Sequence, residues 1–183
     1  ISVGLGNFNF VTSCQRYGHA ITGHIADVGD VGDDLPTTVS FENMTFASQS
    51  DERAATLWCA YLNLEFLDCR FIGMQNDPVA CRGQDDPSVD TYFAQGGALH
   101  VEKCNVRIQR CHFEDNYVWA TGHSEIYAQG GAIYAQESWV TIYDSSFIDN
   151  HAHAWAIPHP QGEDVEIESY ATGGAIHALA DTA

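Results

Sequence analysis

The chain contains Gly96-Gly97-Ala98-Leu99-His100 and repeats this motif twice, which indicates its fold class. It returns as Gly130-Gly131-Ala132-Ile133-Tyr134 and as Gly173-Gly174-Ala175-Ile176-His177. Such self-similarity within one chain is the sequence signature of a repeat architecture. The three glycine pairs therefore mark equivalent positions in three copies of one repeat.

A second motif follows the first two glycine pairs at a constant distance. Phe113 stands seventeen residues after Gly96, and Phe147 stands seventeen residues after Gly130. An asparagine follows each phenylalanine at +3, as Asn116 and Asn150. The two motifs therefore belong to one repeating unit.

Working outward from these phenylalanines gives five copies of one half-repeat, which runs from an aliphatic residue to a phenylalanine seven positions later. The copies are Val3–Phe10, Val39–Phe46, Leu64–Phe71, Val106–Phe113 and Val140–Phe147. Alternation with period two marks a strand with one buried face, and one extra residue in the middle turns a corner into a second strand. A further strand begins after each glycine pair, so the pattern predicts three short strands per repeat.

These repeats predict an all-β fold, a right-handed parallel β-helix (solenoid) of about five coils with long loops at one corner. Like residues stack above like residues in such a fold, with neighbouring coils about 4.8 Å apart. No segment keeps the i, i+3, i+4, i+7 spacing of an amphipathic helix. We expect one β-helix domain over residues 1–183, which is an excerpt of a longer protein or the protomer of a fibre.

The charge of the chain limits its partners. The formal net charge is −18, with one lysine, so a nucleic acid would be repelled. No apolar run reaches the roughly 18 residues of a membrane span, which argues against membrane insertion. Six cysteines and the sequon Asn43-Met44-Thr45 fit an extracellular or cell-surface location, with a glycan expected on Asn43. Cys69 and Cys111 share one column, where a disulfide and a pair of buried thiols remain equal alternatives.

Residues 93–178 resemble the chlamydial polymorphic outer-membrane-protein repeat, which carries GGA[IL] followed by FxxN. This chain contains the FxxN motif twice, as Phe113-Glu114-Asp115-Asn116 and Phe147-Ile148-Asp149-Asn150, and the GGA[IL] motif at each of the three glycine pairs. The first half departs from the pattern, since Ala54-Ala55 stands where the glycine pair is expected. The resemblance implies a β-helical surface or adhesin-like protein, and it implies no catalytic residues.

Three long excursions, over about 74–94, 116–128 and 150–171, are predicted to leave the stack at one corner as loops. Their candidate binding residues are Trp119, His123, His151, His153 and Trp155. Aromatic side chains on loops above a rigid stack suit a glycan or a surface protein, although the same rings would also serve to pack the loops onto the stack. Phe93, Tyr127 and Tyr170 share one offset before the glycine pairs, and we expect them in the core.

An acidic insertion near residue 30 is the one candidate cofactor site, for calcium. Its carboxylates are Asp27, Asp30, Asp33 and Asp34. Several carboxylates and glycines in a short loop suit a hard cation, but a solvated acidic loop has the same composition. His151 and His153 alone are a weak basis for a transition-metal site.

The sequence favours a structural or adhesin-like role over catalysis. Pectin-active lyases and hydrolases also use β-helices, but they need clustered carboxylates and a supporting base. The predicted columns here place Glu65 beside Arg107 and Thr141, and Asp68 beside Arg110 and Asp144, and neither is such a cluster.

Neither end of the predicted stack carries a polar cap. The residues at these ends are Val3, Leu5, Phe8, Phe10, Ile176 and Ala178. Uncapped sheet edges invite pairing, so we expect contact with flanking coils of the same protein or head-to-tail assembly into a surface filament.

Overall fold

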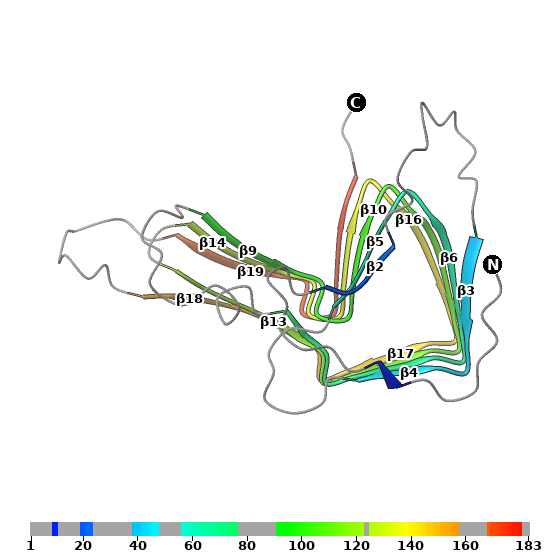
Figure 1. The fold of residues 1–183 in the computed structure, drawn as a ribbon. Helices are drawn as coiled ribbons and strands as arrows, with labels where there is room; N and C mark the ends of the chain where they lie inside the picture. The colour runs from blue at the N-terminus through cyan, green and yellow to red at the C-terminus, as the bar shows by residue number, and fades with distance from the viewer. Residues whose placement is uncertain are drawn as a thin grey trace.

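The computed structural model describes residues 9–10, 19–23, 38–47, 56–76, 91–122, 125–157 and 168–180. These residues form β-strands joined by short turns, with no helix among them, so none of the described elements is an apolar helix that could cross a membrane. The strands make five sheets, and every strand pairing within them is parallel (Figure 1). The predicted all-β, parallel architecture is thereby confirmed.

Three of the sheets surround the main core, and each is built from equivalent strands of successive repeats. Sheet A contains β3 (Thr38–Glu42), β6 (Asn63–Leu67), β11 (Asn105–Gln109) and β16 (Trp139–Tyr143). Sheet B contains β1 (Asn9–Phe10), β4 (Thr45–Ala47), β7 (Arg70–Ile72), β12 (His112–Glu114) and β17 (Ser146–Ile148). Sheet C contains β2 (His19–Gly23), β5 (Thr56–Ala60), β10 (Leu99–Glu102), β15 (Ile133–Gln136) and β20 (Ile176–Leu179).

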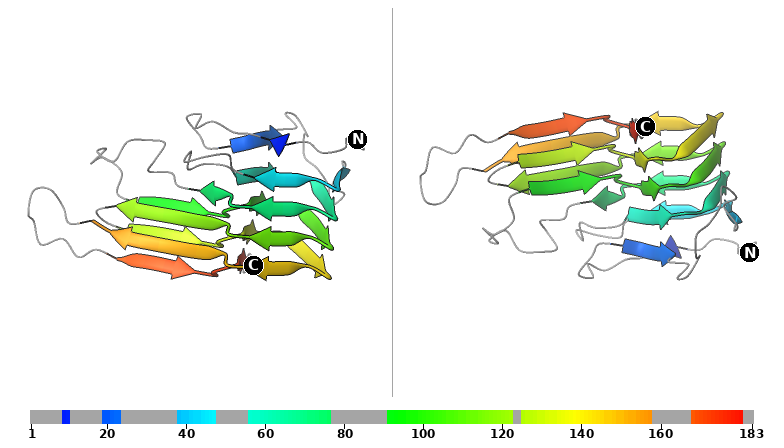
Figure 2. Two further views of the ribbon diagram at one scale, coloured as in Figure 1. Left: turned by 90° about the horizontal axis from the view of Figure 1, so that it is seen from below. Right: turned by 90° about the horizontal axis from the view of Figure 1, so that it is seen from above.

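Two smaller sheets form a wing that projects from the side of this core (Figure 1). Sheet D contains β8 (Gln75–Asn76), β13 (Tyr117–Gly122) and β18 (His151–Ala156). Sheet E contains β9 (Thr91–Gln95), β14 (Glu125–Gln129) and β19 (Ser169–Thr172). A full repeat visits the sheets in the order C, A, B, D, E, and successive repeats lie one above the other (Figure 2).

The wing corrects two predictions. Full repeats have five strands rather than three, and much of the predicted loop at 116–128 and 150–171 is strand. The physical reason is a second period-two pattern, in which Val118 and Ala120 on β13 face Ile126 and Ala128 on β14 and are fully buried. The chain therefore leaves the core as one strand and returns as another, with a small core of its own.

Stacked identical side chains fill the main core. The Phe46, Phe71, Phe113 and Phe147 rings form one column, with neighbouring ring centroids 4.4–4.7 Å apart and ring planes within 9° of parallel. Leu57, Leu99 and Ile133 form an equivalent buried column on sheet C. Column stacking on this scale removes large apolar surfaces from water and aligns the aromatic rings.

A left-handed residue turns each corner between sheets A and B. Asn43, Asp68, Arg110 and Asp144 occupy equivalent positions there, with φ between 47° and 54°. Asparagine and aspartate adopt this backbone region more readily than other non-glycine residues, whereas arginine does so rarely. The extra residue predicted between the inward positions is therefore the left-handed corner residue.

Where a cysteine, serine or asparagine follows a left-handed corner, its inward side chain bonds neighbouring repeats together. Cys111 Sγ donates to the Gln109 carbonyl in its own repeat (3.3 Å) and to the Phe66 carbonyl in the preceding repeat (3.4 Å). The Cys111 N–H in turn donates to Ser145 Oγ of the following repeat (3.0 Å). These bonds satisfy corner peptide groups inside the core, where an unpaired group would be costly.

The asparagine of the FxxN motif has the same role at the corner between sheets B and D. Asn116 Nδ2 donates to the Phe71 carbonyl (3.0 Å) and to Asn150 Oδ1 (2.8 Å), and Asn116 Oδ1 accepts from the Met74 N–H (3.0 Å). Asn116 is fully buried. The motif therefore marks a hydrogen-bonded ladder inside the stack.

The four cysteines within the described residues are free, buried thiols. They are Cys59, Cys69, Cys104 and Cys111. The open alternative for Cys69 and Cys111 is thus settled in favour of thiols, and no disulfide joins the cysteines that the structure describes. Burial raises the pKa of Cys59 to about 12, so this thiol stays protonated at neutral pH. Cys14 and Cys81 lie outside the described residues.

The second glycine of each pair allows a close approach of two backbones. A Cβ on Gly131 would lie 2.0 Å from the Gly174 carbonyl oxygen and 2.5 Å from the His151 nitrogen. We expect Gly131→Ala to lower the free energy of unfolding by about 3 kcal/mol, because backbone atoms cannot move aside. Urea unfolding followed by far-ultraviolet circular dichroism measures this change.

Gly174→Ala is the matched control in the same column. The nearest atom to a Cβ there is the Asn150 carbonyl oxygen at 3.5 Å, an ordinary contact. Its unfolding free energy should stay within about 0.5 kcal/mol of the unsubstituted protein. Equal losses in the two variants would contradict the close-approach explanation.

Candidate functional site

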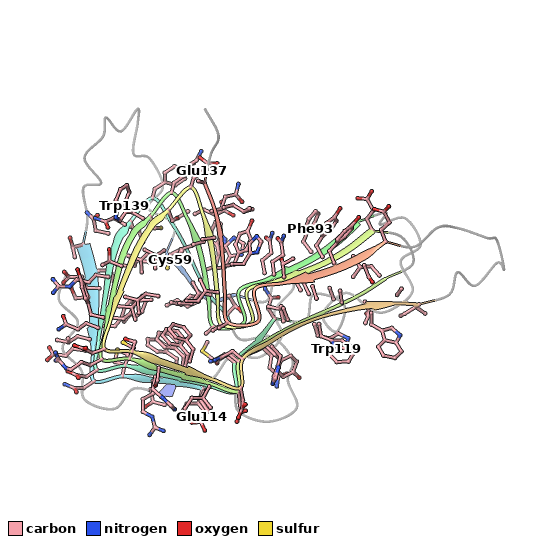
Figure 3. All side chains as sticks on the ribbon, turned by 180° about the vertical axis from the view of Figure 1, so that it is seen from behind. Cys59, Phe93, Glu114, Trp119, Glu137 and Trp139 are labelled. Carbon is pink, nitrogen blue, oxygen red and sulfur yellow. The ribbon has the colours of Figure 1, made fainter. Side chains whose placement is uncertain are left out.

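The wing is thin because small side chains line its interior. Ala94, Ala120 and Ala128 are fully buried between sheets D and E, and Ala152 and Ala154 continue the lining in the outermost repeat. Since side chains alternate along a strand, the larger neighbours of these alanines point to the two outer faces. Phe93 and Trp119 accordingly lie on opposite sides of the wing (Figure 3).

Four of the five predicted binding residues come together on the outer face of sheet D. Trp119 and His153 stack with ring centroids 4.4 Å apart, and His153 and Trp155 lie 6.0 Å apart. Trp155 is 56% exposed, and His151 is exposed on the same strand. These residues stand on β13 and β18 rather than on loops. The fifth residue, His123, lies outside the described residues.

The outer face of sheet E carries a second aromatic column. Phe93, Tyr127 and Tyr170 share one register, as predicted, with neighbouring centroids 4.9 and 5.1 Å apart. Their predicted place in the core is wrong, because Phe93 is 52% and Tyr170 is 44% exposed. The alternation that buries Ala94 and Ala128 turns the adjacent rings outward. Because the rings are stacked on one another, their edges rather than their faces meet solvent.

Carboxylates accompany two of these rings. The Tyr170 hydroxyl donates to Glu168 Oε2 at 2.7 Å, and the Tyr127 hydroxyl lies 3.5 Å from Glu125 Oε2. The hydrogen bond from Tyr170 and the charge of Glu168 raise the pKa of Tyr170. The tyrosines therefore remain neutral hydrogen-bonding groups at physiological pH.

The wing joins sheet C through a polar column and an aromatic column. Gln95 Nε2 donates to Gln129 Oε1 at 2.8 Å at the base of the wing. On sheet C, His100 and Tyr134 stack with centroids 4.8 Å apart, and both residues are buried. His177 continues the column above Tyr134, with the ring planes 1° from parallel. This junction fixes the base of the wing against the core.

Sheet A presents a polar groove on its outer face. Its volume is about 460 Å³, and its lining comprises Thr38, Asn63, Leu64, Glu65, Asn105, Arg107, Thr141 and Tyr143. Ser40 Oγ donates to Glu65 Oε2 (3.2 Å), and Arg107 Nη2 donates to Gln109 Oε1 (3.1 Å). The lining was not among the predicted binding residues. The sequence signal that could have found it is the outward set of positions on β6, β11 and β16.

The predicted ionic column at the corner between sheets A and B is present in part. Arg110 Nε and Nη2 each donate to a carboxylate oxygen of Asp68 at 2.7 Å. This bidentate bond holds the pKa of Asp68 below its usual value. The pair is largely solvent-accessible, so it contributes little to stability. Because the charges of Asp68 and Arg110 are paired with each other, we assign this corner a structural role and not a binding role.

The remaining predicted residues are divided between described and undescribed parts of the chain. Asn43 is exposed at a left-handed corner. The acidic residues Asp27, Asp30, Asp33 and Asp34 lie outside the described residues, as do Val3, Leu5 and Phe8. In the part of the chain that the structure describes, no three metal-ligating side chains cluster, so the pair His151 and His153 gains no third ligand there.

The two predicted ends occupy the outer strands of the sheets. Phe10 lies on β1, where it pairs with Phe46 of β4. Ile176 and Ala178 lie on β20, the outer strand of sheet C, and Ile176 is 37% exposed.

His100 makes stability depend on pH. Burial lowers the pKa of His100 below 6.5, although Glu102, 2.9 Å from its Nε2, opposes this shift. The unfolded chain therefore binds a proton below about pH 6.5 while folded His100 stays neutral, so stability is lost as the pH falls through that value toward the lowered pKa. We expect the thermal midpoint to fall between about pH 7.5 and 5.5, and to fall less in His100→Gln. Exposed His151→Gln is the control, and an equal change in its pH profile would contradict the assignment.

Asn43 should accept a glycan when the chain passes through a secretory pathway that glycosylates sequons. Its exposed side chain follows strand β3 and is not part of the core. Intact mass spectrometry should show a glycan on the unsubstituted chain and none on Thr45→Ala, which keeps Asn43 but destroys the sequon. An unglycosylated product from such a host would show that the site is not used.

Comparison with known proteins gives no match for this chain. No family model matches its sequence, no curated protein matches it, and no solved structure matches its fold. Its function therefore has to be inferred from the stack, the wing and the groove themselves.

Proposed function

We propose that this chain is part of a right-handed parallel β-helix that serves as a structural, adhesin-like element outside the cell or at its surface. The observation that carries the proposal is the unbroken register of the inward columns on sheets A and B. The phenylalanine column of sheet B continues through β4, β7, β12 and β17 without a shift. Parallel crossover connections are right-handed in nearly all proteins, which supports the proposed hand.

The resemblance to the chlamydial surface-protein repeat supports the same proposal. Its two motifs coincide with positions that the stack needs, namely the close approach at Gly131 and the ladder through Asn116. A repeat selected for these two features would stack in the same way wherever it occurs. The motifs therefore support a stack-building role, and they assign no chemistry.

The outermost described repeat supports contact with a further coil. Val106, Ile108 and Phe113 are buried, whereas their equivalents Val140, Ile142 and Phe147 are only half-buried. The same repeat presents the outer strands of sheets A, B, D and E, and β20, which follows it, is the outer strand of sheet C. A coil with the same column pattern would bury these side chains and pair these strands. We propose that this coil belongs to a flanking segment or to a second copy in a head-to-tail filament.

The wing is the second candidate for function, as a surface that contacts a partner protein. The observation that favours this role is that both faces of the wing carry exposed aromatic rings. Phe93 and Tyr170 lie on one face, and Trp155 lies on the other. Stacked rings present edges and hydroxyl groups, which suit a protein surface better than the flat face of a sugar. Polysaccharide cleavage is a third and weaker alternative, because the sheet A groove is lined by a single carboxylate, Glu65.

Electron microscopy of the protein isolated from its natural source tests the filament. We expect fibres in which strands repeat about every 4.8 Å along the axis. Ile176→Lys should abolish fibre formation, because it places a charge on the inward side of the outer strand β20. Ile148→Lys, on an exposed outward position of β17, an outer strand at the same end of the sheets, is the matched control and should leave the fibres intact.

Discrete particles from native material would contradict the filament. If those particles contained a chain much larger than 183 residues, the flanking-coil version of the stack would remain the explanation. A crystal structure showing strands of one repeat that do not wind around a common axis would overturn the β-helix itself.

A further inference from the structure

We propose that the outer face of sheet A binds a neutral, hydroxyl-rich oligosaccharide. The inference goes beyond the stack and does not depend on the wing. It begins from the groove on this face, whose volume of about 460 Å³ lies in the usual range of ligand sites, about 300–1,000 Å³. The groove crosses strands β3, β6, β11 and β16, so its contacts come from four stacked repeats.

The side chains on this face are suited to hydroxyl groups. Asn63 and Asn105 stand side by side on β6 and β11 and contribute amides, each of which has donors and an acceptor. Glu65 and Arg107 are also neighbours, and they contribute a carboxylate and a guanidinium. The bond from Arg107 to Gln109 occupies one of the five N–H donors of the guanidinium. Planar groups with paired donors or acceptors match the adjacent hydroxyls of a sugar ring.

Two aromatic rings flank these polar groups in the outermost repeat. Trp139 is 77% exposed and Tyr143 is 51% exposed, both on β16. Trp139 stands in the column of Asn63 and Asn105, and it lies at the outside of the sheet near the turn from β15 (Figure 3). The Cα atoms of Trp139 and Tyr143 are four positions apart on the strand, or about 13 Å, a length suited to a short oligosaccharide rather than one sugar.

The aromatic rings on the outer face of sheet A differ from those on the wing in whether they stack on other rings. The aromatic rings described on the wing stack on one another, as Trp119 does on His153. The Trp139 ring stacks on no other ring among the described residues. Because the ring is also 77% exposed, its flat apolar surface is open to the C–H face of a sugar.

Charge decides between neutral and anionic ligands. The chain carries a formal net charge of −18, which disfavours uronates and sulfated glycans over the molecule as a whole. Within the groove lining, Glu65 and Arg107 balance each other, so the site has no local excess of positive charge to overcome that repulsion. A ligand without charge and with many hydroxyls fits both conditions.

Calorimetric titration of the full chain tests the inference with defined probes. These are neutral hexasaccharides of β-1,4-linked glucose, mannose, xylose and N-acetylglucosamine, and the anionic hexamer of galacturonic acid. We expect at least one neutral hexasaccharide to bind with a Kd below about 1 mM. Trp139→Ala should weaken that binding about tenfold or more, and Arg107→Gln should weaken it as well.

Trp155→Ala is the matched control, because Trp155 is an exposed tryptophan of the same repeat on the wing. Its affinity should remain within about twofold of the unsubstituted chain. Circular dichroism and the thermal midpoint verify that the variants are folded, and fibre formation should be unchanged in Trp139→Ala. That last readout separates a failure of this inference from a failure of the proposed stack.

Three results would overturn the inference. The first is the absence of binding by every neutral hexasaccharide at about 10 mM. The second is tighter binding of the galacturonate hexamer, which would show that charge recognition dominates. The third is an equal loss of affinity in Trp139→Ala and Trp155→Ala, which would show that sheet A is not the specific contact.

Discussion

At most of the described corners one arrangement holds the repeats together, in which a left-handed residue is followed by an inward side chain that bonds to the backbone of the preceding repeat. The left-handed residue turns the chain, but this turn leaves corner peptide groups without strand partners in the interior. The inward side chain supplies those partners, whether it is the thiol of Cys111, the hydroxyl of Ser138 or the amide of Asn116. Because each such side chain bonds to two repeats, the direction of the chain and the stacking of the repeats are fixed together.

This arrangement explains why free thiols are compatible with the fold. A cysteine after a corner makes the same hydrogen bond as the serine at the equivalent position in the next repeat, to the carbonyl two residues earlier. Cys104 and Ser138 show this at one corner, and Cys111 and Ser145 show it at another. The thiol is a weak donor with a larger apolar surface, so it is suited to the deeper repeats, where it is buried. The hydroxyl is suited to the outermost repeat, where water is nearer.

The sequence predicted the core of the stack well because period two and the extra corner residue are strong local signals. It predicted the wing poorly, because alanine lines that interior and alanine carries little weight in a search for buried strands. His151-Ala152-His153-Ala154-Trp155-Ala156 does alternate, but its polar and aromatic members suggested a loop. The shared column of Phe93, Tyr127 and Tyr170 was predicted and is present. The prediction that these rings are buried was wrong, because it rested on the general tendency of aromatic side chains to be buried. The column of Glu65, Arg107 and Thr141 on sheet A was predicted and is present, but it was considered only as a catalytic cluster and not as the lining of a groove.

In the wing, the connections between paired strands differ in length although the repeats that carry them are built alike. Residues 123–124 alone lie between β13 and β14, whereas residues 157–168 lie between β18 and β19. Both excursions nevertheless return to the same glycine corner, and both repeats keep the same register on sheets B and C. The difference in length between these two connections thus leaves the register of the strands on sheets B and C unchanged. A lineage carrying this architecture is free to lengthen, shorten or replace each tip independently, and neighbouring repeats of one molecule become separate sites for variation on a frame that does not change.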